Sequence, residues 1–148
     1  MNVRKAALAD RDAAWRIVTE YYEAIGVVLR EDREVFGEFL SGHGGFWFAV
    51  VNGDTAGCIA LRPLPEHEGA CEIKRLYVRP LFRGLGLAHA LLSAAEDYAL
   101  DAGYDAIYLD TFDALTVATQ FYLRAGYEPT ERYNDNPQAT IFMKKTLR

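Results

Sequence analysis

The sequence is poor in the features that mark membrane, secreted and nucleic-acid-binding proteins. No apolar run approaches the ~18 residues needed to cross a membrane, and the opening MNVRKAALAD lacks the apolar core of a signal peptide. Two cysteines, Cys58 and Cys71, are too few for a disulfide framework. The net charge of −5 argues against the basic surface of a nucleic-acid-binding protein. We therefore expect a cytoplasmic protein with free thiols that binds neither membranes nor nucleic acid.

Histidine is equally scarce. The three histidines, His43, His67 and His89, are far apart in the sequence, so no metal site is expected. Both cysteines are expected in strands, whereas His67, the histidine nearest to either of them in the sequence, is expected in a loop, which argues against cysteine-based nucleophilic catalysis. What the chain does have is 148 residues with 51% hydrophobic content and no repeat or linker, as expected for one globular domain over 1–148.

One stretch near the middle of the chain predicts a strand, a tight loop and the start of a helix. Residues 71–78 (CEIKRLYV) are rich in strand-forming side chains, and Pro80 ends the strand because it holds Arg79 extended and has no N–H to donate. Arg83-Gly84-Leu85-Gly86 follows, and then an alanine- and leucine-rich helical pattern. Glycines at a helix start let a ligand approach the backbone, and the unpaired N–H groups there favour phosphate. The stretch therefore predicts a phosphate-binding loop.

Two common phosphate-binding patterns do not fit this loop. A P-loop needs Gly-x-x-x-x-Gly-Lys-Ser/Thr, and the lysine and hydroxyl residues are missing. A dinucleotide fingerprint counted from Gly84 would need Gly or Ala where His89 stands. Glu72, Lys74 and Arg75 are also too polar for a strand covered by helices on both faces. A nicotinamide-dinucleotide enzyme therefore stays as the less favoured alternative.

The order of the expected elements predicts an α/β (α+β) fold. Strands are expected over residues 2–7, 46–51, 55–61, 71–78, 106–110, 127–133 and 140–144, and helices over 11–25, 31–40, 84–102 and 114–125. Asn52-Gly53 is a strong hairpin signal between two of these strands. A hairpin half joined to a β-α-β half is best accommodated by one sheet with helices on both faces.

Residues 83–88 resemble a loop of the GNAT superfamily of acyl-CoA-dependent N-acetyltransferases. In that family Arg/Gln-x-x-Gly-x-Gly/Ala opens the helix after the fourth strand and holds the pyrophosphate of coenzyme A; Arg83, Gly86 and Ala88 match it. Residues 118–127 (ATQFYLRAGY) are similar to the family's Ala-x-x-Phe-Tyr-x-x-x-Gly-Phe/Tyr segment. The element order is also the family's, so the resemblance covers essentially the whole chain and extends to a bacterial subgroup of small-molecule type.

The resemblance implies where the cofactor binds. The central sheet is expected to be mixed, mostly antiparallel and twisted, with its central strands splayed around acetyl-CoA, the co-substrate. The backbone of Leu76 and Val78 is expected to pair with the pantetheine arm. The implied cofactor-binding residues are Leu76, Tyr77, Val78, Arg83, Gly84, Leu85, Gly86, Leu87, Ala88 and Ala118. One position departs from the pattern: Leu115 stands where many members carry an Asn that contacts pantetheine.

The resemblance further implies direct attack of an amine on the thioester. Because an alkyl ammonium has a pKa of about 10.4, the reaction needs a proton acceptor at neutral pH. Glu72 matches the family's catalytic glutamate, acting through a water or with its pKa raised by burial. Tyr122 matches the tyrosine that donates a proton or a hydrogen bond to the departing sulfur. Reference pKa values of about 8.5 for a thiol and about 10 for a phenol make this transfer feasible without large tuning.

Both catalytic candidates also have purely structural explanations. Glu72 would be a strand-surface charge paired with Lys74 or Arg75, and Tyr122 would be a core aromatic residue on the same helical stripe as Phe121. A coenzyme A-binding regulatory module without turnover is the alternative from another functional class. The presence of both Glu72 and Tyr122 argues against it.

The acceptor is the least specified part of the prediction. In this family the first two helices and the last two strands build the acceptor pocket, and here they carry acidic and aromatic side chains that suit a cationic amine. Lys74 and Arg75 would instead suit a carboxylate on the acceptor. We expect a small-molecule or amino-acid-like amine, with a peptide N-terminus or lysine next; a homodimer stays open. The expected substrate-binding residues are Tyr22, Lys74, Tyr133 and Asn134.

A thermal-shift comparison of acetyl-CoA, NADPH and ATP distinguishes these alternatives. A ligand at 100 times its Kd adds about 2.7 kcal/mol to the free energy of unfolding. Each kcal/mol raises the Tm of a domain near this size by about 2–4 °C, so acetyl-CoA alone should raise it by more than about 5 °C. A shift with NADPH or ATP, and none with acetyl-CoA, would mean that the glycine loop binds another ligand.

Overall fold

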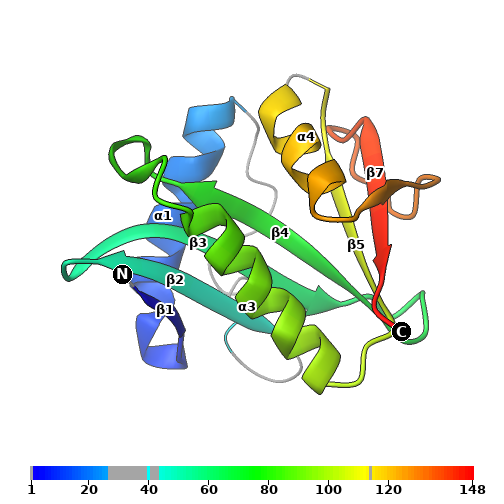
Figure 1. Ribbon diagram of the computed structural model, residues 1–148, viewed down its shortest axis with the longest axis horizontal. Coiled ribbons are helices and arrows are strands. Elements are labelled where there is room, and N and C mark those ends of the chain that lie inside the picture. Colours follow the sequence, from blue (N-terminus) through cyan, green and yellow to red (C-terminus); the bar gives the residue numbers. More distant parts are fainter. Residues whose placement is uncertain (1, 27–39, 41–43, 114) are drawn as a thin grey trace.

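The computed structural model describes residues 2–26, 40, 44–113 and 115–148 (Figure 1). Its helices are α1 (Arg11–Ile25), α3 (Leu87–Asp101) and α4 (Thr116–Arg124), with short 3-10 turns at Leu8–Asp10 and Pro80–Phe82. Its strands are β1 (Asn2–Lys5), β2 (Gly45–Val51), β3 (Asp54–Pro63), β4 (Ala70–Val78), β5 (Ala106–Thr111), β6 (Glu128–Pro129) and β7 (Ile141–Thr146). No helix in these ranges is long and apolar enough to cross a membrane.

The strands form one open, seven-stranded sheet in the order β1-β2-β3-β4-β5-β7-β6. The pair β4–β5 is parallel and the other neighbouring pairs are antiparallel. The β2–β3 hairpin turns at Asn52 and Gly53, whose φ angles of 50° and 84° are those that a tight two-residue turn needs. The predicted fold class, a mixed and mostly antiparallel sheet, is confirmed.

The sheet opens at its centre, between β4 and β5. Their ladder joins residues 70–72 to residues 106–108 and includes no later pair in the described chain. Figure 1 shows the two strands meeting near the C-terminus of the chain and separating toward α1 and α4. On its other edge β4 carries a bulge, where the register with β3 shifts between Cys58 and Ala60 and Arg75 adopts a φ of 61°. The bulge changes the direction of β4 where it leaves β5.

Helices cover both faces of the sheet. On one face α1 buries Ala14, Ile17 and Val18 against Phe46 and Phe48. On the other face α3 packs against β2, β3 and β4 (Figure 1), and its buried side chains are Leu87, Leu91, Leu92, Ala95 and Ala99. α4 adds Tyr122 to this second cluster. The two layers of helices therefore flank the opening between β4 and β5 from opposite sides.

Several expected boundaries differ from the structure. α3 begins at Leu87 rather than at residue 84, because the left-handed φ angles of Gly84 and Gly86 (84° and 77°) keep the preceding loop out of the helix. α4 spans Thr116–Arg124, and the strand expected over 127–133 is reduced to Glu128–Pro129. The helix expected over 31–40 lies outside the described residues except at residue 40.

Replacing the central leucine of α3 tests this core. Leu91 is fully buried, so Leu91→Ala should cost about 2–5 kcal/mol of unfolding free energy through lost burial and a cavity. The Tm measured by circular dichroism should fall by about 5–15 °C. Leu100→Ala, on the same helix with 43% of the side chain exposed, is the matched control and should change it little. Equal losses for the two variants would contradict the packing of α3.

Candidate active site

A groove with a volume of about 820 Å³ lies in the opening between β4 and β5. The start of α3 and one side of α4 complete its walls, and Tyr21 and Ile25 of α1 reach it from the opposite face of the sheet. Nine of the ten expected cofactor-binding residues line it: Leu76, Tyr77, Val78, Arg83, Gly84, Gly86, Leu87, Ala88 and Ala118. Leu85 does not line the groove and is 54% exposed.

The glycine loop presents backbone N–H groups at one end of this groove. In the turn before the loop, the backbone N–H of Arg83 donates to the carbonyl oxygen of Pro80 (3.4 Å). At the start of α3, the backbone N–H of Ala90 donates to the carbonyl oxygen of Gly86 (3.2 Å). A Cβ atom added to Gly84 or Gly86 would meet no protein atom within 4 Å. The loop is therefore open toward the groove, and its N–H groups and the α3 dipole favour an anion there.

Arg83 ties this loop to the end of β4. Its Nε donates a hydrogen bond to the carbonyl oxygen of Val78 at 3.2 Å. The side chain is exposed, so one edge of the guanidinium remains on the surface of the groove. Leu115, where the family pattern has Asn, also lines the groove, so an apolar side chain occupies that part of the wall.

Tyr122 lies in the wall of the groove that α4 provides. Its ring is packed edge-on against Phe121 and Tyr127, and the residue is 8% exposed. Burial, and then the negative charge of Asp110, raise the pKa of the Tyr122 phenol above its ordinary value. The phenol therefore stays protonated at neutral pH. Because its pKa lies above that of a free phenol, Tyr122 is a weaker acid than the sequence analysis expects. Donation of a hydrogen bond to the sulfur is therefore favoured over full transfer of the proton.

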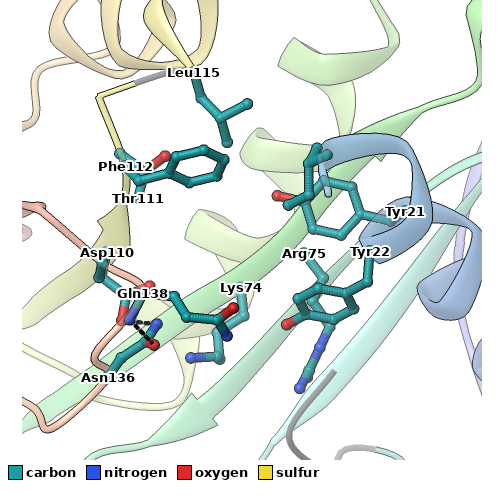
Figure 2. A pocket seen from close by; sticks show the side chains of 12 residues that line it. Tyr21, Tyr22, Lys74, Arg75, Asp110, Thr111, Phe112, Leu115, Asn136 and Gln138 are labelled. Carbon is teal, nitrogen blue, oxygen red and sulfur yellow. Dashed lines mark hydrogen bonds between the residues drawn. The ribbon is translucent and has the colours of Figure 1, made fainter. Parts of the chain in front are cut away.

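A smaller pocket of about 70 Å³ adjoins the groove on the α1 side of the sheet. Figure 2 shows Tyr21 and Tyr22 of α1 on one side of it and the end of β5, with Asp110, on the other. Lys74 and Arg75 of β4 lie between them. The remaining lining residues are Ile25, Thr111, Phe112, Leu115, Asn136, Gln138 and Ala139. Because seven residues line both cavities, the small pocket is continuous with the groove.

Glu72 is fully buried and lines neither cavity. Arg62 Nε donates to its Oε1 at 2.8 Å, and Lys74 Nζ lies 3.6 Å from the same oxygen. The Tyr133 hydroxyl and the Asn134 amide (3.1 Å) both donate to Oε2. Burial, and then the negative charges of Glu72 and Asp110, raise the pKa of the Tyr133 phenol. Glu72 is thus a paired interior carboxylate.

The segment between β6 and β7 supplies these contacts. Arg132 shapes it by donating to the carbonyl oxygens of Asn134 (3.4 Å), Asn136 (3.1 Å) and Ala139 (3.2 Å). The side-chain oxygen of Asn134 accepts a hydrogen bond from the backbone N–H of Asn136 (3.0 Å), and that of Asn136 accepts one from the backbone N–H of Gln138 (3.1 Å), as in Asx turns. Their amide groups then donate to Asp110 Oδ2 at 2.6 and 3.4 Å. The segment thereby holds Asp110 in place.

The expected substrate-binding residues divide into two groups. Tyr22 and Lys74 line the small pocket, whereas Tyr133 and Asn134 lie beside it and bind Glu72. Asp110 was not among the expected site residues, although it lines both cavities. The only signal for it in the sequence is an acidic residue at the end of an apolar strand, ahead of the Asn-x-Asn-Pro segment. Among the residues that the structure describes, no three His, Cys, Asp or Glu side chains form a metal-binding group.

Comparison with known proteins identifies the family. The family model for the acetyltransferase (GNAT) family matches residues 11–127, which is more than half of the chain. The chain belongs to the GNAT acetyltransferase family. The resemblance inferred from the glycine loop and the Phe-Tyr segment is thereby confirmed, and GNAT proteins act on amine acceptors.

Relatives and solved structures agree with this family. An uncharacterized N-acetyltransferase of Schizosaccharomyces pombe is 42% identical over 86 residues, 58% of this chain and 52% of the relative. The chain therefore spans about half the length of that relative. A GNAT-family acetyltransferase from Staphylococcus aureus has a TM-score of 0.85 at 20% identity, with 99% of both chains covered. PaiA N-acetyltransferase of Thermoplasma acidophilum, solved in complex with coenzyme A, has a TM-score of 0.72 at 19% identity; the match covers 99% of this chain and 98% of the other. Both structures share the fold.

Proposed function

We propose that this GNAT protein transfers the acetyl group of acetyl-CoA to a primary amine by direct attack in a ternary complex. The observation that carries the proposal is the groove through the opened sheet. It joins the open glycine loop at the start of α3 to a small pocket on the α1 side. Two substrates entering from opposite faces would meet inside it, beside Tyr122.

The chain's own groups fit acetyl-CoA, which supplies the thioester. The N–H groups of the loop at Gly84 and Gly86 suit the pyrophosphate, and the exposed Arg83 adds a positive charge there. β4 beyond Glu72 has no ladder pair with β5 in the described chain, which leaves room for an extended pantetheine arm to pair with the backbone of Leu76 and Val78. The carbonyl oxygen of Val78 already accepts one hydrogen bond, from Arg83. Ala118 leaves room on the α4 wall.

We propose Tyr122 as the hydrogen-bond donor to the departing sulfur. Its phenol is held neutral by burial, so a proton is present when the C–S bond breaks. Stabilising the thiolate in this way lowers the barrier to acyl transfer, with a solvent proton completing the thiol.

We propose that Glu72 takes part in accepting the proton of the amine without contacting the amine directly. Since it is fully buried and paired with Arg62 and Lys74, a proton can reach it only through a water or a polar side chain.

We propose a small-molecule or amino-acid-like amine as the acceptor. The pocket presents a carboxylate, Asp110, opposite the aromatic side chains of Tyr21 and Tyr22, which suits an ammonium group. Lys74 lines the same pocket and is placed to bind a carboxylate on the acceptor.

Substituting Gly86 tests the pyrophosphate site. Gly86→Val should raise the Kd for acetyl-CoA at least about tenfold, which is ~1.4 kcal/mol, because the side chain would fill the space that the loop leaves for the ligand. Calorimetric titration measures this. Gly103→Val is the matched control: its φ is also positive (91°) and its site equally open, but it lies at the other end of α3. Equal acetyl-CoA affinity in both variants would contradict the site.

Substituting Tyr122 tests the chemical step. Tyr122→Phe should lower kcat for amine-dependent thiol release from acetyl-CoA by about 10²-fold or more, while the Kd for acetyl-CoA stays close to that of the wild type. The control is Tyr127→Phe, which removes another buried hydroxyl, one bonded to Glu96 (2.8 Å) away from both cavities. It should lower Tm and leave kcat unchanged. A normal kcat for Tyr122→Phe would remove Tyr122 from the mechanism.

A further inference from the structure

Resting on the proposed function, we further propose that Asp110 is the carboxylate that contacts the acceptor amine and takes its first proton. Glu72 and Asn134 then act as positioning residues that hold Asp110. The geometry supports this assignment in three ways: access to the substrates, free hydrogen-bonding capacity, and coupling to Tyr122.

The two carboxylates, Asp110 and Glu72, differ in whether a bound substrate can reach them. Asp110 lines both the groove and the small pocket, at the place where they join, and it is partly exposed. Glu72 lines neither cavity and has no exposed surface. A general base must lie within hydrogen-bond reach of the proton it removes, directly or through one water. Of these two groups, only Asp110 meets that condition without an intermediary.

The two carboxylates, Asp110 and Glu72, also differ in their hydrogen bonds. Both bonds to Asp110, from Asn134 and Asn136, go to Oδ2. Within the described ranges no donor reaches Oδ1 of Asp110, so this oxygen is available to an ammonium group in the pocket. On Glu72, by contrast, Oε1 is paired with Arg62 and Lys74, and Oε2 accepts from Tyr133 and Asn134. The charge of Glu72 is already compensated inside the protein.

Asp110 is also electrostatically coupled to the acid of the reaction. Both groups line the groove, and the negative charge of Asp110 contributes, after burial, to the raised pKa of Tyr122. The titratable groups around Asp110 are Tyr21 and Tyr22 of α1, Glu72, Lys74 and Arg75 of β4, Tyr122 of α4 and Tyr133 of the β6–β7 segment. An amine bound to Oδ1 of Asp110 would therefore lie on the α1 side of the thioester, with Tyr122 on the α4 side.

The proposed step balances as follows. The acceptor's ammonium group gives one proton to Oδ1 of Asp110, and the resulting amine attacks the acetyl carbon. As the C–N bond forms and the C–S bond breaks, the nitrogen loses a second proton. One proton ends on the thiol of coenzyme A, whose thiolate Tyr122 stabilises, and the other passes from Asp110 to solvent. The products are an amide, a thiol and one released proton.

Asn134 explains how Glu72 contributes without contacting substrate. Its Nδ2 donates to Glu72 Oε2 (3.1 Å) and to Asp110 Oδ2 (2.6 Å), so one amide orients both carboxylates. Glu72, anchored by Arg62, fixes this amide, and the amide in turn holds Oδ2 of Asp110. The other oxygen of Asp110 is thereby left for the acceptor.

The test compares carboxylate-to-amide variants at three positions. Wild-type protein is first screened for thiol release from acetyl-CoA with the twenty protein amino acids and straight-chain alkylamines, and the best acceptor becomes the probe. Asp110→Asn should lower kcat/KM for that amine about 10²–10⁴-fold near neutral pH, with the rate recovering as pH rises toward the amine pKa of about 10.4. Asp113→Asn, an exposed carboxylate outside both cavities, is the control and should match the wild type.

Glu72→Gln distinguishes positioning from proton transfer. We expect it to lower kcat while keeping the wild-type shape of the pH–rate profile, because Asp110 still accepts the proton. Asp110→Ala distinguishes a chemical role from a structural one. Added formate, a small carboxylate, should restore part of the activity of Asp110→Ala, and it should not restore that of Glu72→Gln. Tm and the Kd for acetyl-CoA, measured for each variant, confirm that the fold and the cofactor site are intact.

Three results would overturn the assignment. Wild-type activity and an unchanged pH profile in Asp110→Asn, with both altered in Glu72→Gln, would make Glu72 the direct base. Loss of activity in Asp110→Ala that formate does not restore would reduce Asp110 to a structural residue. If the wild-type protein binds acetyl-CoA but releases no thiol with any amine, the proposed function itself fails and Asp110 loses its role with it.

Discussion

The separation of β4 from β5 is the constraint on which the rest of the site depends. The two strands are paired only over residues 70–72 and 106–108, and beyond that each leaves backbone groups without a partner across the opening. Buried backbone N–H and C=O groups need hydrogen bonds, so an opened sheet favours an extended ligand that pairs as a strand would. The bulge at Arg75 gives β4 the change of direction that produces this opening. The groove is thus a consequence of strand geometry.

The opening also explains why the polar groups lie on the two faces as they do. The face covered by α3 and α4 provides the glycine loop and Tyr122, and the face covered by α1 provides Tyr21, Tyr22 and the Asp110 pocket. A thioester reaching through the sheet from the first face would meet an amine bound on the second. Neither face alone holds both the glycine loop and the Asp110 pocket, so the arrangement fits the proposed complex with two substrates bound together.

Turn chemistry and periodicity predicted the local elements, and the order of these elements, together with the resemblance to the GNAT family, predicted the fold class. The strand, loop and helix around Gly84 and Gly86, and the hairpin at Asn52-Gly53, follow from turn chemistry and periodicity within a few residues, and the structure contains both. Asp110 could not be found in this way, because its contact with Asn134 joins residues 24 apart and that of Asn134 with Glu72 joins residues 62 apart. The start of α3 was placed too early because the helical pattern does not reveal the positive φ of a glycine.

The burial of Glu72 is best explained by the neighbour it supports. Placing a carboxylate in the interior costs free energy, which the ion pairs with Arg62 and Lys74 and two further hydrogen bonds offset only in part. An ion pair used only for packing could be replaced, both partners together, by apolar side chains at little cost. A carboxylate that accepts from Asn134, which in turn donates to Asp110, cannot be replaced by an apolar side chain without losing one of the bonds that hold Asn134 in place. The interior charge is therefore more informative about acceptor chemistry than about stability.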